Sequence, residues 1–196
     1  MSSLRERKRT RTREALIEAA ADLFERRGYD GTTIADIAAA ADISARSFFS
    51  YFASKEDVLF PDGDARIRAA VTAIDERRPE ERPTEILLRA LNELGDAGGD
   101  LVGPMAALRL RFIRSVPSVR GRGLQLQHDA QAEIADRLHA VFPDQLDEVE
   151  AAALVGAFVG AIGGALEVLM RDGHADPEVL RERLQRATAV ALRPWT

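Results

Sequence analysis

Residues 44–52 carry side chains that could hydrogen-bond to the edges of nucleic-acid bases. A helix that opens on Ser44 turns Phe48 and Phe52, four positions apart, toward the interior. The opposite side then holds residues that are mostly small or polar: Ala45, Arg46, Ser47, Phe49 and Ser50. A guanidinium and hydroxyl groups on such a face have the donors that base edges in a major groove accept.

The residues just before this segment predict a second short helix. Thr33 can open it, with Asp36 three positions later as a capping-box partner. Apolar residues recur behind Thr33 at helical spacing: Ile34, Ile37, Ala38 and Ala41. Asp42 falls in the turn and tolerates a left-handed backbone. Two short helices around a tight turn outline a helix-turn-helix DNA-binding motif.

Three sequence blocks extend this pattern and resemble the TetR family of bacterial transcriptional regulators. They are residues 15–24 followed by Arg27, Gly28 and Tyr29, then residues 32–38, then residues 48–57. Together these blocks are highly specific and cover roughly the first third of the chain, whereas the remainder matches in length and helical character. Two positions depart from the family pattern. The family usually has glycine where this chain has Asp42, and tyrosine where it has Phe49, so a hydroxyl that would bind a phosphate is absent at the second position.

The resemblance implies a homodimeric regulator, most often a repressor, that binds a pseudo-palindromic operator and is released by a small molecule. We expect Ala45, Arg46 and Ser47 to meet base edges, and Thr33, Tyr51 and Lys55 to hold phosphates. The predicted DNA-binding residues are Arg9, Thr33, Ser44, Ala45, Arg46, Ser47, Phe49, Ser50, Tyr51 and Lys55.

The charge distribution supports a nucleic-acid partner although the net charge of −5 does not. Six basic residues precede the motif, with Glu6 as the one acidic residue among them: Arg5, Arg7, Lys8, Arg9, Arg11 and Arg13. A basic arm on an otherwise acidic chain concentrates phosphate attraction at one end. The alternative is a solvated tail that only aids solubility.

Helical periodicity without sustained two-residue alternation predicts an all-α protein of about nine helices. The first helix is expected at about 12–27 and later ones at about 84–96, 104–115, 119–142, 147–171 and 177–192. We expect an N-terminal three-helix DNA-binding domain with the helix-turn-helix at 1–55. A C-terminal helical ligand-binding and dimerisation domain should follow at 56–196.

Residues 151–170 contain two overlapping Gly-x-x-x-Gly patterns, and Glu167 is the one charged residue among them. A membrane helix is one interpretation, but the uncharged run over 151–166 is shorter than the roughly 20 residues that a bilayer needs. A soluble helix in a two-fold interface, packed with the last helix into a four-helix arrangement, fits better. An ordinary core helix of a monomer is the alternative.

The later helices predict a cavity for a small molecule, as the resemblance implies. The candidate lining residues are Met105, Leu108, Phe112, Leu124, His128, Phe158, Ile162 and Glu167. Core packing explains each of them individually. Arginines between Arg109 and Arg122 could receive an anionic head group, and the chain resembles members that sense fatty acyl-CoA-like ligands. A fatty acyl thioester is therefore the expected effector class.

Catalytic and metal chemistry find no basis in the sequence. The chain has no cysteine, its three histidines are far apart, and no glycine-rich phosphate loop or serine elbow occurs. We expect no cofactor and no metal, and disfavour a helical enzyme. The N-terminus does not have the pattern of a signal peptide, which favours a cytoplasmic protein. The rival hypothesis is a helical ligand-binding or scaffolding module without a DNA-binding role.

Overall fold

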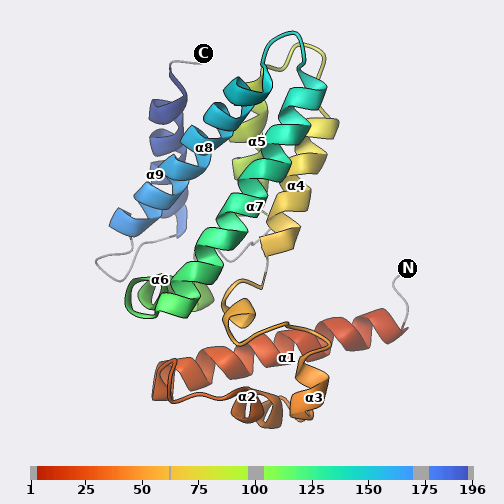
Figure 1. Ribbon diagram of the computed structural model, residues 1–196, viewed down its shortest axis with the longest axis vertical. Helices are drawn as coiled ribbons and strands as arrows, with labels where there is room; N and C mark the ends of the chain where they lie inside the picture. The colour runs from red at the N-terminus through yellow and green to blue at the C-terminus, as the bar shows by residue number, and fades with distance from the viewer. Residues whose placement is uncertain (1–3, 62, 97–103, 170–176, 194–196) are drawn as a thin grey trace. The chain divides into compact units, whose positions relative to one another are not determined.

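A computed structural model describes residues 4–61, 63–96, 104–169 and 177–193, which contain helices and no strand (Figure 1). The elements are α1 (Leu4–Arg27), α2 (Ile34–Ala40), α3 (Ala45–Phe48), the 3₁₀ helix η1 (Glu56–Leu59), α4 (Gly63–Asp75), α5 (Pro83–Asp96), α6 (Pro104–Ser115), α7 (Pro117–Val141), α8 (Glu148–Leu169) and α9 (Pro177–Leu192). The predicted all-α class of about nine helices is confirmed.

Two compact units make up the chain, and neither is continuous in sequence. The first comprises Met1–Pro61 and Gly103–Gly123, and the second comprises Asp62–Val102 and Leu124–Thr196. The expected division fell after residue 55. The first unit also contains η1, α6 and the start of α7. The reason lies in packing between residues that are distant in sequence.

The core of the first unit joins α1, the helix-turn-helix, η1 and α6. Leu16, Leu23 and Phe24 of α1 are buried in it, together with Ile37 and Phe48 of the two short helices. Helix α6 adds Met105, Leu108 and Phe112, each about 5% exposed or less. These three predicted ligand-lining residues thus belong to the core that supports the DNA-binding motif. Apolar residues at helical spacing suit either role, so spacing alone did not separate the two.

Helix α1 begins at Leu4, well before the predicted start near residue 12. Arginine and lysine are good helix formers, and Glu6 lies in the first turn, where a negative charge favours the helix dipole. The expected basic arm is therefore helical from residue 4 onward. Arg5, Arg7, Lys8, Arg9 and Arg11 are all exposed on it.

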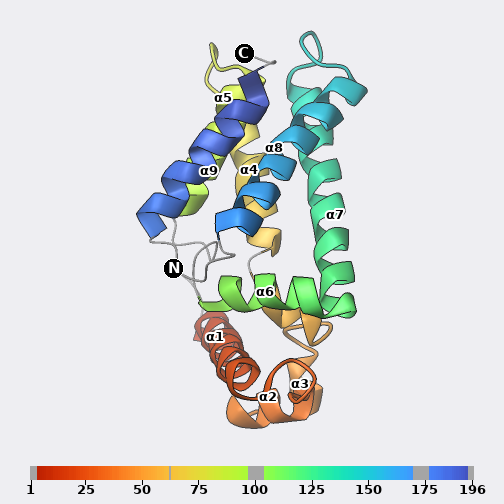
Figure 2. The ribbon, with the colours of Figure 1, turned by 90° about the vertical axis from the view of Figure 1, so that its left-hand side faces the viewer.

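The core of the second unit is built from α4, α5, α8, α9 and the C-terminal part of α7. Ile74, Ile86, Leu138, Leu154 and Leu192 are among its buried residues. Helices α8 and α9 pack along each other, as do α4 and α5 (Figure 2).

An arginine clamp joins α4 to α5 in this unit. Arg89 Nη2 donates to the Ala73 carbonyl at 2.8 Å, and Arg89 Nε donates to Glu81 Oε1 at 2.7 Å. The hydrogen bond from Arg89 also holds the pKa of the Glu81 carboxyl below its usual range.

We predict that Phe112→Ala lowers the free energy of unfolding of the first unit by about 3–5 kcal/mol, because it opens a cavity in a packed core. Urea unfolding followed by circular dichroism measures this loss. Ile113→Ala is the matched control at the neighbouring, half-buried position and should cost clearly less. Equal losses for the two variants would show that Phe112 is not a core residue.

Candidate nucleic-acid interface

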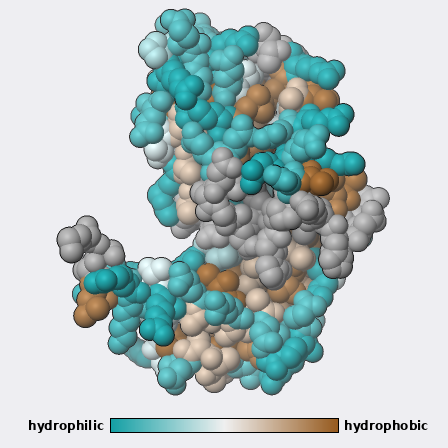
Figure 3. All heavy atoms as spheres, turned by 180° about the vertical axis from the view of Figure 1, so that it is seen from behind, coloured by the Kyte–Doolittle hydropathy of each residue, from teal (hydrophilic) through white to brown (hydrophobic). Residues whose placement is uncertain are grey.

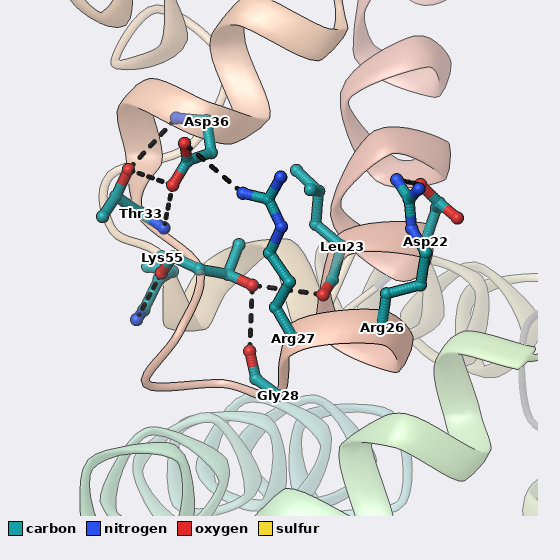
Figure 4. Close-up of polar contacts among 9 residues, drawn as sticks. Asp22, Leu23, Arg26, Arg27, Gly28, Thr33, Asp36 and Lys55 are labelled. Carbon is teal, nitrogen blue, oxygen red and sulfur yellow. Dashed lines mark hydrogen bonds and ion pairs between the residues drawn. The ribbon is translucent and has the colours of Figure 1, made fainter.

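Helix α2 opens with the capping box that the sequence predicts. The Asp36 amide donates to Thr33 Oγ1 at 3.1 Å, and the Thr33 amide donates to Asp36 Oδ2 at 2.9 Å (Figure 4). The hydrogen bonds from Thr33 hold the pKa of the Asp36 carboxyl below its usual range, with a smaller contribution from Arg27. The cap therefore fixes the first residue of the motif.

The turn between α2 and α3 depends on Asp42. Its φ angle is +56°, which confirms the expectation that Asp42 tolerates a left-handed backbone in this turn. The Ile43 amide then donates back to the Ala38 carbonyl at 2.9 Å. The chain therefore turns between α2 and α3 within four residues, 41–44.

Helix α3 is capped by Ser44, whose hydroxyl accepts the Ser47 amide at 3.1 Å. The regular helix ends at Phe48, earlier than the predicted segment, and residues 49–51 continue as a turn. Phe48 and Phe52 are nevertheless both buried, as expected, at 0% and 5% exposure.

The opposite side of α3 forms an exposed face that we call the reading face: Ala45, Arg46, Phe49 and Ser50. Among the described residues, Arg46 has no hydrogen-bond or ion-pair partner, so its guanidinium donors are available to a ligand. Ser44 Oγ and Ser47 Oγ lie 2.8 Å apart and share one hydrogen, which leaves one hydroxyl hydrogen to donate elsewhere.

The loop before α2 is fixed by buried polar contacts. Thr32 is fully buried, and its hydroxyl lies 2.9 Å from the Gly28 carbonyl and 3.2 Å from the Leu23 carbonyl. Gly28 ends α1 with a φ of +71°, as a C-cap glycine should. A Cβ at Gly31 would overlap the Arg27 carbonyl oxygen, so this position accepts only glycine. Sequence reasoning missed Thr32 and Gly31 because the contacts that explain them follow from the path of the loop.

Lys55 has internal partners instead of an outward ammonium. Its Nζ donates to the carbonyls of Tyr29 and Thr32, both at 2.9 Å, and lies 3.9 Å from the centre of the Tyr29 ring. We expected Lys55 to hold a phosphate. In the structure its ammonium group instead connects the loop before α2 to the segment that follows α3.

Thr33 and Tyr51 were also predicted to hold phosphates. The Thr33 hydroxyl donates to Asp36 Oδ2 at 2.6 Å, so it offers no hydrogen to a phosphate in this structure. Tyr51 is half-buried, with its side chain packed against the core of the first unit. Arg9 lies exposed on α1.

The arginines between Arg109 and Arg122 are mostly engaged within the first unit. Arg109 is buried and donates to the Leu59 carbonyl at 3.2 Å, and Arg122 Nε pairs with Asp57 Oδ1 at 2.6 Å. Arg111 contacts Glu25, and Arg120 donates to the carbonyls of Ile113 and Arg114. These contacts account for the cluster without an anionic ligand.

The eight predicted ligand-lining residues do not share one core. Met105, Leu108 and Phe112 are in the first unit, and the other five are in the second. There, Phe158 is buried and Ile162 packs half-buried against the core, whereas Leu124, His128 and Glu167 are exposed. In the part of the chain that the structure describes, no group of three or more His, Cys, Asp or Glu residues could hold a metal ion.

Helices α2 and α3 are capped, pack on the core of the first unit and leave one face of α3 exposed. These features define a helix-turn-helix DNA-binding protein. Residues 16–60 match the family model described as bacterial regulatory proteins, tetR family. The regulator TcmR of Streptomyces glaucescens is 31% identical over 194 residues, which cover 96% of this chain and 84% of TcmR. The repressor DhaR of a Mycobacterium species is 33% identical over 102 residues, about half of each chain.

Solved structures share the fold at lower identity. A TetR regulator from Rhodococcus matches with a TM-score of 0.58 at 16% identity and covers 99% of this chain and 100% of its own. The repressor FadR of Thermus thermophilus, solved with lauroyl-CoA, matches with a TM-score of 0.56 at 20% identity and covers 94% of this chain and 95% of FadR. The chain belongs to the TetR family and is a transcriptional regulator, not an enzyme.

We predict that Lys55→Ala lowers the free energy of unfolding by about 1.5–3 kcal/mol, because two carbonyl oxygens lose a charged donor. Urea unfolding measures this loss, and Arg46→Ala, which removes an exposed and unpartnered side chain, is the control that should leave stability unchanged. If Lys55→Ala instead keeps full stability and binds every duplex more weakly, the result would contradict the structural role and favour a phosphate contact by Lys55.

Proposed function

We propose that this regulator is a homodimeric repressor that binds a pseudo-palindromic operator in the cytoplasm and is released by a small apolar or amphipathic effector. The observation that carries the DNA-binding part is the reading face, whose Arg46 is exposed and unpartnered while caps and core hold α3 in place. The name of DhaR, a repressor, supports the negative sign of the regulation.

On the DNA, Ala45, Arg46 and Ser47 meet base edges, with Ser44, Phe49 and Ser50 beside them. Phosphate contacts come from Arg9 and the other exposed basic residues of α1, and from the Tyr51 hydroxyl. Thr33 and Lys55 act mainly by positioning these groups, because their hydrogen-bond donors already have internal partners.

The exposed apolar surface of α8 supports the homodimer. This helix is long and apolar enough to span a membrane by composition alone, yet only 17% of its most apolar window is buried. Hydrophobic residues are also exposed on the face seen in Figure 3. The exposed valines are Val149 and Val168 on α8 and Val179 and Val190 on α9. A second copy would cover this surface.

The glycines of α8 point to the same partner. A Cβ at Gly156, Gly160, Gly163 or Gly164 would meet no atom within 4 Å, so packing within one chain does not require glycine there. Glycine in a helix interior costs roughly 0.5–1 kcal/mol relative to alanine, and close approach of a second helix backbone would offset that cost.

The effector we propose is an apolar or amphipathic molecule bound in the second unit, with a fatty acyl thioester as the first class to examine. Phe158 and Ile162 supply apolar surface in that unit, and a protein of the same fold was solved with lauroyl-CoA. An effector that weakens operator binding must itself bind the operator complex more weakly by the same factor. A titration in which lauroyl-CoA leaves operator binding unchanged would exclude it as the effector.

We predict that Arg46→Ala weakens binding to an operator by about 1–3 kcal/mol per half-site while it leaves binding to random duplexes largely intact. Duplexes enriched from a random pool by the wild-type protein supply the operator, and fluorescence anisotropy supplies the affinities. Arg9→Ala is the control, because loss of a phosphate contact weakens both duplexes alike. Equal losses on both duplexes for Arg46→Ala would remove it from the base edges.

We predict that Gly160→Leu dissociates the dimer, because a leucine side chain holds the two helices apart. The substitution has open space within one chain, so the monomer should fold normally. Gly121→Leu on α7 is the matched control, since it too meets no atom within 4 Å and belongs to the first unit. Sedimentation equilibrium at micromolar concentration measures association. A monomeric wild type, or equal association of both variants, would contradict the interface.

A further inference from the structure

Phe49 is a large aromatic side chain exposed on the reading face. It is 57% exposed, whereas its neighbours Phe48 and Phe52 are buried. Its ring packs edge-on against Phe48, with centroids 5.6 Å apart and an interplanar angle of 84°. This contact holds the ring in a defined orientation, so Phe49 presents a fixed apolar surface beside Arg46.

The reading face has an apolar half and a polar half. Ala45 and Phe49 are four positions apart, so they lie on the same side of the helical turn, and Arg46 and Ser50 are paired in the same way. Phe49 keeps helical backbone angles, with φ −65° and ψ −9°, so this spacing holds beyond the end of α3. The two halves therefore lie next to each other along the surface that meets DNA.

The apolar half has one chemical complement in the major groove. Base edges there present hydrogen-bond donors and acceptors together with a single apolar group, the C5 methyl of thymine. A phenylalanine ring has no donor for a phosphate or a base edge. Contact with DNA through this ring is therefore favourable only where an apolar group displaces water from it.

We infer that Phe49, with Ala45 beside it, recognises the C5 methyl group of a thymine in each operator half-site. The inference rests on the proposed operator binding and specifies one base that this binding selects. Phe49 follows Arg46 by three positions, which is about 4.5 Å along the helix axis. This rise is close to the distance of about 3.4 Å between successive base pairs. The thymine therefore lies one or two base pairs from the base that Arg46 contacts.

Replacing single thymines by deoxyuridine tests this inference, because it removes the methyl group and leaves base pairing intact. The operator is first enriched from a random duplex pool with the wild-type protein, and each thymine is then replaced in turn. We expect one position per half-site where the replacement weakens wild-type binding about three- to fivefold, the loss expected for one buried methyl group. Phe49→Ala removes the ring from both half-sites of the dimer, so it should weaken binding to the thymine operator by about this factor for each half-site and respond no further to deoxyuridine there.

Two variants serve as controls. Phe49→Leu keeps an apolar side chain and should stay sensitive to the methyl group, and Ser50→Ala changes an exposed neighbour and should stay as sensitive as the wild type. An unchanged thermal midpoint of Phe49→Ala verifies its fold. If the pool yields no enriched duplex, the proposed operator binding fails. If an operator is found but no deoxyuridine weakens wild-type binding, or Phe49→Ala remains sensitive, the methyl inference alone is overturned.

Discussion

The aromatic contact among Phe24, Tyr29 and Phe112 is the interaction on which the DNA-binding unit depends. The three ring centroids lie 5.6–5.7 Å apart in pairs and join α1, the loop after it and α6. Lys55 lies over the Tyr29 ring and donates to the backbone of the same loop. Burial raises the pKa of the Tyr29 hydroxyl above its usual range, and the Glu56 carboxylate beside it adds to the shift. The hydroxyl therefore stays neutral at any physiological pH.

This contact explains why α6, far along the chain, belongs to the unit that reads DNA. The two short helices of the motif have 7 and 4 residues and provide little apolar surface of their own, and α2 packs on α1, which α6 also contacts. Leu108 and Phe112 complete the core from α6, and Arg109 extends it with a buried hydrogen bond to the Leu59 carbonyl. A change in the position of α6 therefore acts on the same core that positions the reading face.

Local sequence signals predicted the features that depend on neighbouring residues. The Thr33 and Ser44 caps, the left-handed Asp42 and the inward Phe48 and Phe52 all follow from spacings of two to four positions. The contacts that local sequence signals did not predict involve partners farther apart. Lys55 meets carbonyls 23 and 26 residues earlier, and Phe112 packs on Phe24. Apolar periodicity shows that a residue is buried but does not identify the helix against which it packs.

Native-state hydrogen exchange of α1 and α6 tests most directly whether α6 belongs to the DNA-binding core. We predict that the most protected amides of residues 16–24 and 105–112 exchange through one opening, with the same free energy and the same dependence on denaturant. Amides of α5, in the other unit, are free to differ. Exchange of α6 together with α5, at a free energy distinct from that of α1, would contradict the account.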